Sequence, residues 1–158
     1  MTDQPDRIKR VRQKVSRYCA TAERSPRQLK DRLVKEGLST SQIEQVLQQL
    51  RKDNFLNETR FALAYCHDKI KFNAWGKLRV KQELKFHQIP TPEIEHALEA
   101  FSEIEYQEIL LHVLERKLRQ LSTEENLLLK KKKMIDYALR KGFESDLVFK
   151  KVQQLLSA

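Results

Sequence analysis

The chain has 158 residues, and its 31 Lys and Arg residues against 22 Asp and Glu residues give a formal net charge of +9. Only three glycines and four prolines are present, which is too few turn residues for an all-β fold, so the composition predicts an all-α protein. The excess of basic residues favours an anionic partner, which is either a nucleic acid or an acidic protein surface.

The first two predicted helices are separated by a capping signal. A helix is predicted over residues 6–23, because apolar residues recur there at helical spacing. Ser25 followed by Gln28 is the pattern of a capping box, and Pro26 stands at the favoured first position of the next helix. Gly37 is expected to end that helix in a left-handed conformation.

The same helix–turn–helix pattern occurs three times along the chain. Residues 27–50 align with residues 78–101 at a shift of 51 and with residues 132–155 at a shift of 105. The apolar positions, the turn and the predicted caps agree in this register: Leu29 with Val80 and Met134, Gly37 with Gly142, Ile43 with Ile94 and Val148, Leu47 with Leu98 and Val152, and the caps Thr40, Thr91 and Ser145. This agreement predicts an internal repeat of about 50 residues.

The repeat defines the expected domain organisation. We predict an N-terminal basic helix over 1–24 and helical repeats over 25–75, 76–121 and 122–158, with the third helix of the last repeat missing or truncated. The pattern "STEE", Ser122–Glu125, predicts another capping box that opens a helix. Such units bury little surface alone and stack on their neighbours, so we expect an elongated, all-α protein of tandem three-helix repeats.

Basic residues gather in three clusters along the chain. The first group of candidate contact residues is Lys69, Lys71, Lys77, Arg79, Lys81 and Lys85. The second group is Lys130, Lys131, Lys132 and Lys133, followed by Arg140 and Lys141. A third cluster runs from Arg7 to Arg17. One such cluster is typical of a solvated helix face, whereas three at related places on stacked repeats can line one surface for an anionic partner.

The stretch "NAWGKLRVKQEL", residues 73–84, contains the single tryptophan. Gly76 lies 51 residues after Ser25 in the repeat register, so we predict that it is a helix N-cap and not part of a phosphate-binding loop. Trp75 and Phe72 have two open interpretations. They stack on a nucleobase, or they close the joint between two helical units.

The sequence contains no pattern that indicates catalysis or a bound cofactor. The four histidines do not form HExxH, and neither GxxxxGK[ST] nor GxGxxG is present, so no metal, nucleotide or catalytic site is predicted. Cys19 and Cys66 have no metal-like spacing and fit reduced thiols. No apolar run suits a membrane span or a signal peptide, so we expect a cytoplasmic protein.

Three stretches resemble the RecX family of bacterial recombination regulators. They are "VSRYCATAERSPRQLKDRLVKEGL", "FLNETRFALAYCHDKI" and "WGKLRVKQELKFHQI". The resemblance covers residues 11–156, nearly the whole chain. It departs from the family pattern at Asn57-Glu58, where members often carry an acidic pair, and at Gln88, where a glycine is common.

The resemblance implies three tandem three-helix repeats in a curved, elongated molecule, without cofactor or catalysis. Members of the family bind the RecA recombinase and its filament on single-stranded DNA, and inhibit ATP hydrolysis, coprotease activity and strand exchange. Many also bind DNA weakly. For this chain we therefore expect RecA as the partner, a monomeric state, and the basic residues from Lys69 to Lys85 as the first candidates for contact.

Two other functions fit the residues alone. The first is a basic α-helical protein that binds nucleic acid independently of RecA, which predicts tight, steeply salt-dependent binding to naked DNA. The second is a generic α-repeat scaffold for an acidic partner.

Overall fold

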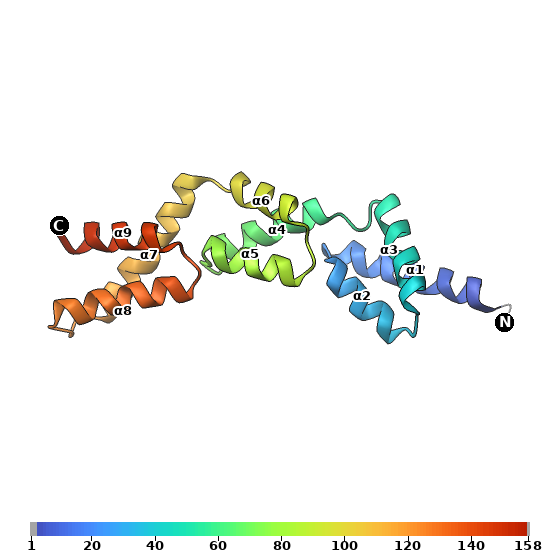
Figure 1. Cartoon of the computed structure of the whole chain (residues 1–158), viewed down its shortest axis with the longest axis horizontal. Coiled ribbons are helices and arrows are strands. Elements are labelled where there is room, and N and C mark those ends of the chain that lie inside the picture. Colours follow the sequence, from blue (N-terminus) through green and yellow to red (C-terminus); the bar gives the residue numbers. More distant parts are fainter. Residues whose placement is uncertain (1–2, 158) are drawn as a thin grey trace. The chain divides into compact units, whose positions relative to one another are not determined.

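The computed structural model describes residues 3–157, and every regular element in that range is an α-helix (Figure 1). The helices are α1 (Asp3–Thr21), α2 (Pro26–Lys35), α3 (Thr40–Lys52), α4 (Glu58–Lys71), α5 (Lys77–Phe86), α6 (Thr91–Ala100), α7 (Glu103–Gln120), α8 (Leu127–Arg140) and α9 (Ser145–Ser157). Residues 1, 2 and 158, at the ends of the first and last predicted segments, lie outside the described residues. The predicted all-α fold is confirmed.

The capping box at the start of α2 is confirmed. The Ser25 hydroxyl accepts a hydrogen bond from the Gln28 amide at 3.1 Å, and the Gln28 side chain accepts one from the Ser25 amide at 2.9 Å. The predicted cap of α3 is wrong by one residue, because the box is formed by Ser39 with Gln42 and Thr40 is the first helical residue. The Ser39 side chain, one residue earlier, accepts from the Gln42 amide, which has no partner within the helix.

The same offset occurs at the other two predicted caps. Thr91 and Ser145 are the first residues of α6 and α9, and the preceding carbonyls, those of Pro90 and Glu144, accept the first helical hydrogen bonds. All three predicted caps thus lie one residue inside their helices.

The predicted capping box at residues 122–125 is wrong. The Ser122 amide still donates to the carbonyl of Arg119, so this serine belongs to the turn that ends α7. The N-cap of α8 is Asn126, whose side chain accepts a hydrogen bond from the Leu129 amide at 3.1 Å. The preceding Glu124 accepts a hydrogen bond from the Asn126 amide.

The repeat register is confirmed by the turn that follows α2, α5 and α8. Gly37, Gln88 and Gly142 have left-handed φ values of 83°, 64° and 97°. The next residue in each copy donates its amide to a carbonyl five residues earlier: Leu38 to Leu33, Ile89 to Leu84, and Phe143 to Ala138. This is the Schellman ending, which glycine favours. Gln88 therefore adopts the conformation of the glycines, at a cost of about 1–2 kcal/mol.

The chain divides into two compact units. One contains the residues up to Ala64 together with Leu84–Ile94, and the other contains Tyr65–Glu83 together with the residues from Glu95 onward. In the first unit, α1, α2 and α3 pack around a core formed by Val11, Val15, Leu29, Leu33, Ile43, Val46, Leu47 and Leu50. In the second, α7, α8 and α9 pack around Tyr106, Leu110, Leu114, Met134, Phe143, Val148 and Val152, all of which are buried.

Candidate interface

Several candidates of the first group lie near the start of α5. This helix begins directly after Gly76. The Val80 amide donates to the Gly76 carbonyl at 3.2 Å, so Gly76 occupies the predicted N-cap position. Its own amide donates to the Lys141 carbonyl at 2.7 Å. A Cβ on residue 76 would lie 2.1 Å from the carbonyl carbon of Gly142. Glycine is therefore required at this position by the close backbone contact, whereas the cap alone would also accept a serine.

Trp75 and Phe72 have different environments. The Trp75 ring is half-buried, with the Arg79 guanidinium carbon 3.9 Å and the Lys69 ammonium nitrogen 4.9 Å from its centroid. The Tyr65 ring packs against it edge-on. Trp75 thus packs in the joint between α4 and α5, where its ring already holds two cations. The Phe72 ring is 71% exposed.

Lys77 is the least accessible of the candidate residues that form ion pairs. Only 18% of its side chain is exposed, and its ammonium nitrogen lies 3.4 Å from a Glu103 carboxylate oxygen and 4.6 Å from the Tyr106 ring centroid. Its backbone amide donates to the Tyr106 hydroxyl, which donates in turn to the Glu144 carboxylate. Burial, reinforced by this bond, raises the pKa of Tyr106 well above its ordinary value. Lys77 is therefore engaged in the packing of its unit.

The other candidates of the first group remain on the surface. Lys71 lies 3.6 Å from the Glu105 carboxylate, with both side chains about half exposed, so the pair holds it weakly. Lys81 forms no ion pair with any residue in the range 3–157. Lys85 is exposed and belongs to the first unit.

The second group lies at the start of α8. Lys130, Lys131 and Lys132 form no ion pair with residues 3–157, whereas Lys133 lies 3.2 Å from the Glu124 carboxylate. Lys141, at the other end of α8, lies beside the α4–α5 loop. Its ammonium group donates a hydrogen bond to the Asn73 carbonyl at 3.3 Å. The rise of an α-helix places the group of four about 12–17 Å along α8 from Lys141.

Sequence reasoning placed Lys141 in a basic cluster but not at this loop. The position of Lys141 depends on the contact between Gly76 and the turn at Gly142. In the sequence, the only indication of this contact is the presence of glycine at both positions.

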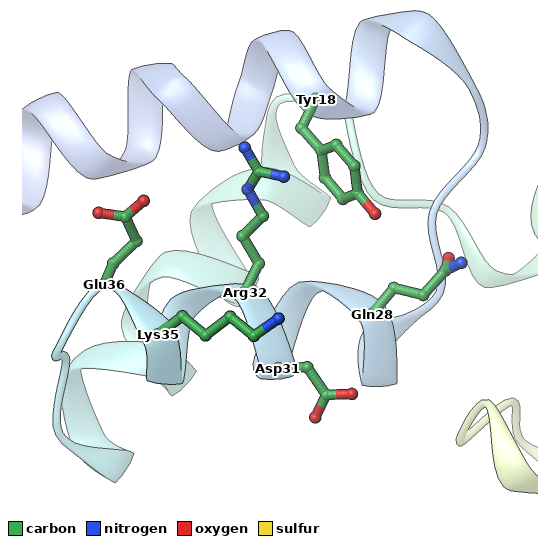
Figure 2. A pocket seen from close by; sticks show the side chains of 6 residues that line it. All are labelled: Tyr18, Gln28, Asp31, Arg32, Lys35 and Glu36. Atoms are coloured by element: carbon green, nitrogen blue, oxygen red, sulfur yellow. The ribbon is translucent and has the colours of Figure 1, made fainter.

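In the first unit, part of the basic cluster of α1 holds α1 against the end of α2. The Lys14 ammonium nitrogen lies 2.7 Å from a Glu36 carboxylate oxygen, and this hydrogen bond lowers the pKa of Glu36. Arg7 donates to the Glu36 carbonyl. Figure 2 shows a groove beside these contacts, where Arg32 of α2 faces Tyr18 of α1, with 4.5 Å between the guanidinium carbon and the ring centroid.

The two cysteines differ in exposure, since Cys66 is buried and Cys19 is partly buried. Burial raises the pKa of Cys19 to about 11 and that of Cys66 to about 12, so both thiols are protonated at neutral pH and are poor nucleophiles. Within residues 3–157, no three His, Cys, Asp or Glu side chains gather as metal ligands. No helix in that part of the chain combines the length and apolar character needed to cross a bilayer.

Two family models match the chain. The model described as "RecX, second three-helix domain" matches residues 57–98, and the one described as "RecX, third three-helix domain" matches residues 103–152. Together they cover more than half of the sequence. The chain belongs to the RecX family. These RecX models group each repeated helix pair with the helix before it, whereas our predicted boundaries group each pair with the helix after it; those boundaries remain a prediction.

Relatives and solved structures agree with this assignment. The chain is 30% identical over 153 residues to "Regulatory protein RecX" of Bacillus subtilis, covering 95% of the chain and 56% of the relative. It is 28% identical over 152 residues to the protein of that name from Bacillus licheniformis, covering 94% and 56%. The chain thus spans about half the length of these RecX relatives.

A crystal structure of RecX from Lactobacillus salivarius has the same fold. Its TM-score is 0.86 at 19% identity, over 98% of this chain and 99% of that one. A second crystal structure, of a regulatory protein RecX, has a TM-score of 0.85 at 18% identity over 95% of this chain and 73% of that one. The predicted arrangement of tandem three-helix repeats is confirmed by the RecX fold.

Proposed function

We propose that this protein regulates the RecA recombinase. It binds the RecA filament on single-stranded DNA and inhibits its ATPase, coprotease and strand-exchange activities, and so modulates DNA repair and recombination. The observation that carries the proposal is the RecX family membership, together with relatives named as regulatory proteins. In this role the protein acts in the cytoplasm as a monomer, and it binds and releases the filament without catalysis or a cofactor.

We propose that cationic side chains contact the filament. Lys69, Arg79 and Lys81 of the second unit have no carboxylate partner among residues 3–157, so their charge is available to an anionic surface. Lys71 extends this set, and Lys85 of the first unit is a separate candidate contact. The lysines from Lys130 to Lys133 form a second candidate contact. The net charge of +9 supports attraction to a nucleoprotein filament.

The proposed function is tested by RecA ATP hydrolysis on single-stranded DNA. We expect substoichiometric amounts of the protein to lower the steady-state rate, because one molecule that bridges or caps a filament affects many RecA protomers. A hydrolysis rate that stays constant at every ratio of the two proteins would exclude this function.

The second candidate is a nucleic-acid-binding protein that acts without RecA. Lys69 and Arg79, which lie on the Trp75 ring and have no carboxylate partner among residues 3–157, favour it, together with the exposed Phe72 ring of the same loop. Affinity capture from a bacterial lysate, with and without nuclease, separates the two functions. RecA that stays bound after nuclease treatment supports the first, and complete loss of all bound protein supports the second.

A further inference from the structure

The loop between α4 and α5 presents an aromatic ring to solvent in a defined position. Phe72 is 71% exposed, although its amide donates to the Asp68 carbonyl at 2.9 Å and so completes the last turn of α4. The His67 ring packs against Phe72 at a centroid distance of 5.8 Å and an interplanar angle of 78°. His67 is held in turn by Asp68, whose carboxylate lies 3.2 Å from its ring nitrogen Nδ1.

The backbone of this loop is fixed by hydrogen bonds from both sides. The Trp75 amide donates to the Lys69 carbonyl at 3.0 Å, and the Gly76 amide donates to the Lys141 carbonyl at 2.7 Å. Ala74 has a left-handed φ of 52°, a conformation that costs a non-glycine residue about 1–2 kcal/mol and that these bonds maintain. A loop fixed in advance loses little entropy when it binds a ligand.

Three cations contact this loop without a carboxylate partner. Lys69 and Arg79 lie on the Trp75 ring, and Lys141 donates to the Asn73 carbonyl. None of the three forms an ion pair with any residue of the described range. The neighbouring Lys71 has only a long, exposed contact with Glu105. The loop therefore combines an accessible ring, that of Phe72, with three cations at Asn73 and Trp75 that have no carboxylate partner among the described residues.

We infer that Phe72 is a stacking platform for a base of single-stranded DNA, with Lys69, Arg79 and Lys141 binding the adjacent phosphates. A single strand offers both a flat base and phosphates, and stacking on aromatic side chains is how such strands are held without sequence preference. In a duplex the base faces are covered by neighbouring pairs, and an acidic protein surface offers carboxylates but no base. Trp75 is not the platform, because its ring carries Lys69 and Arg79.

The inference rests on the proposed function, since a RecA filament on single-stranded DNA is the assembly that would present such a strand to this loop. It is tested without RecA. The probe is a fluorescein-labelled single-stranded oligonucleotide of mixed sequence, with the duplex of the same sequence as a second probe. Binding to the full chain is followed by fluorescence anisotropy.

We expect Phe72→Ala to weaken binding to the single strand about 5- to 100-fold, which is the range for loss of one stacked base. Binding to the duplex should be unchanged, because the cations remain. Phe72→Trp should retain single-strand affinity. The matched control is Phe149→Ala on α9, which removes a ring that is 50% exposed in the same unit and should change neither affinity. Because Phe72 is exposed, its loss should leave the melting temperature unchanged.

Three results would overturn the inference: no binding of the single strand by the unmodified protein, an unchanged affinity in Phe72→Ala, or an equal loss for single strand and duplex. The ATPase experiment is independent of all three. A protein that inhibits RecA but is insensitive to Phe72→Ala in DNA binding keeps its proposed function without this platform. A Phe72-dependent DNA binder that leaves RecA unaffected keeps the platform and loses the proposed function.

Discussion

The backbones of Gly76 and Gly142 are in direct contact. The Gly76 amide donates to the carbonyl that precedes Gly142, and the Leu78 amide donates to the Gly142 carbonyl at 3.0 Å. A Cβ on Gly142 would lie 2.4 Å from the Cβ of Arg79. The start of α5 and the turn after α8 therefore pack without side chains between them, and this contact places Lys141 beside the α4–α5 loop.

Gly76→Ala should strongly destabilise the second unit. The added methyl group would lie 2.1 Å from backbone atoms of Gly142 and Phe143, and backbone cannot move aside as a side chain tip can. We expect a loss of about 3–5 kcal/mol in the free energy of unfolding, measured by urea denaturation with the fluorescence of Trp75, the single tryptophan.

Gly37→Ala is the control for this prediction. Its Cβ would meet only the flexible end of Arg7, at 2.7 Å, and its φ is 83°, so it should cost about 1–2 kcal/mol, measured by circular dichroism. Equal stability of Gly76→Ala and the unmodified protein would contradict the close contact.

Gln88→Gly should stabilise the protein. A glycine adopts the left-handed conformation without strain, which raises the free energy of unfolding by about 1–2 kcal/mol. The greater freedom of glycine in the unfolded chain lowers it by about 0.5–1 kcal/mol. The exposed hydrogen bond from the Lys30 ammonium group to the Gln88 side chain, 2.6 Å long, is also lost. We expect a net gain of about 0.5 kcal/mol in thermal or urea unfolding.

The control for Gln88→Gly is Gln88→Ala. It loses the contact with Lys30 but keeps the unfavourable φ, so it should be neutral or slightly destabilising. If both variants lose stability equally, the left-handed turn is not the cause.

The stabilising effect of Cys66 should decrease at alkaline pH. Burial raises the pKa of this thiol from its ordinary 9.0 to about 12. The folded protein thus keeps a proton that the unfolded chain releases, and stability is lost as pH rises from about 9 toward 12. The stability difference between the unmodified protein and Cys66→Ala should fall by at most about 1.4 kcal/mol per pH unit in that range.

Urea midpoints of both proteins near pH 8 and pH 10 give this difference, and other groups that titrate there cancel because the two proteins share them. A difference that is constant or grows with pH would show that Cys66 is not held as the neutral thiol.

Reversing the charges of Arg79 and Lys81 on α5 should weaken filament binding. We expect Arg79→Glu with Lys81→Glu to reduce affinity for the RecA filament about 10-fold, measured by co-sedimentation or anisotropy. Lys77 is not changed, because a glutamate at this position would lie beside Glu103 and destabilise the folded protein by charge repulsion. Lys150→Glu with Lys151→Glu on α9 makes the same change in net charge elsewhere in the unit. If both double variants lose the same affinity for the filament, the loss is explained by net charge and not by a contact at Arg79 and Lys81.

Most of the fold could be predicted from the sequence, because its signals are local. The apolar spacing of each helix, the box at Ser25 and the left-handed turns at Gly37 and Gly142 depend on residues within one or two turns of helix. Gln88 is a departure from the glycine pattern, and its left-handed turn became evident only in the structure. The error at Thr40 arose because the adjacent Ser39 takes the cap. The error at Ser122 arose because the turn that ends α7 includes this serine, so that α8 begins only after Asn126.

The candidate site could be predicted only as a set of charges. Its residues were identified as basic, but periodicity does not tell which lysine is paired. Lys77 is held by Glu103, while Lys141, absent from the candidate residues, lies at the loop. Phe72 and Trp75 look alike in sequence, and only their neighbours distinguish an exposed ring from one that is half-buried and covered by cations.

The all-α class, the register of the repeats, the excess of positive charge and the resemblance to the RecX family can be recognised in the sequence, since each depends on composition or on nearby residues. Only the tertiary structure shows that Gly76 touches Gly142, that Lys77 is largely covered and paired with Glu103, and that Phe72 is presented to solvent. These features depend on contacts between residues far apart in the chain, and the free energy of such contacts is set by packing in three dimensions.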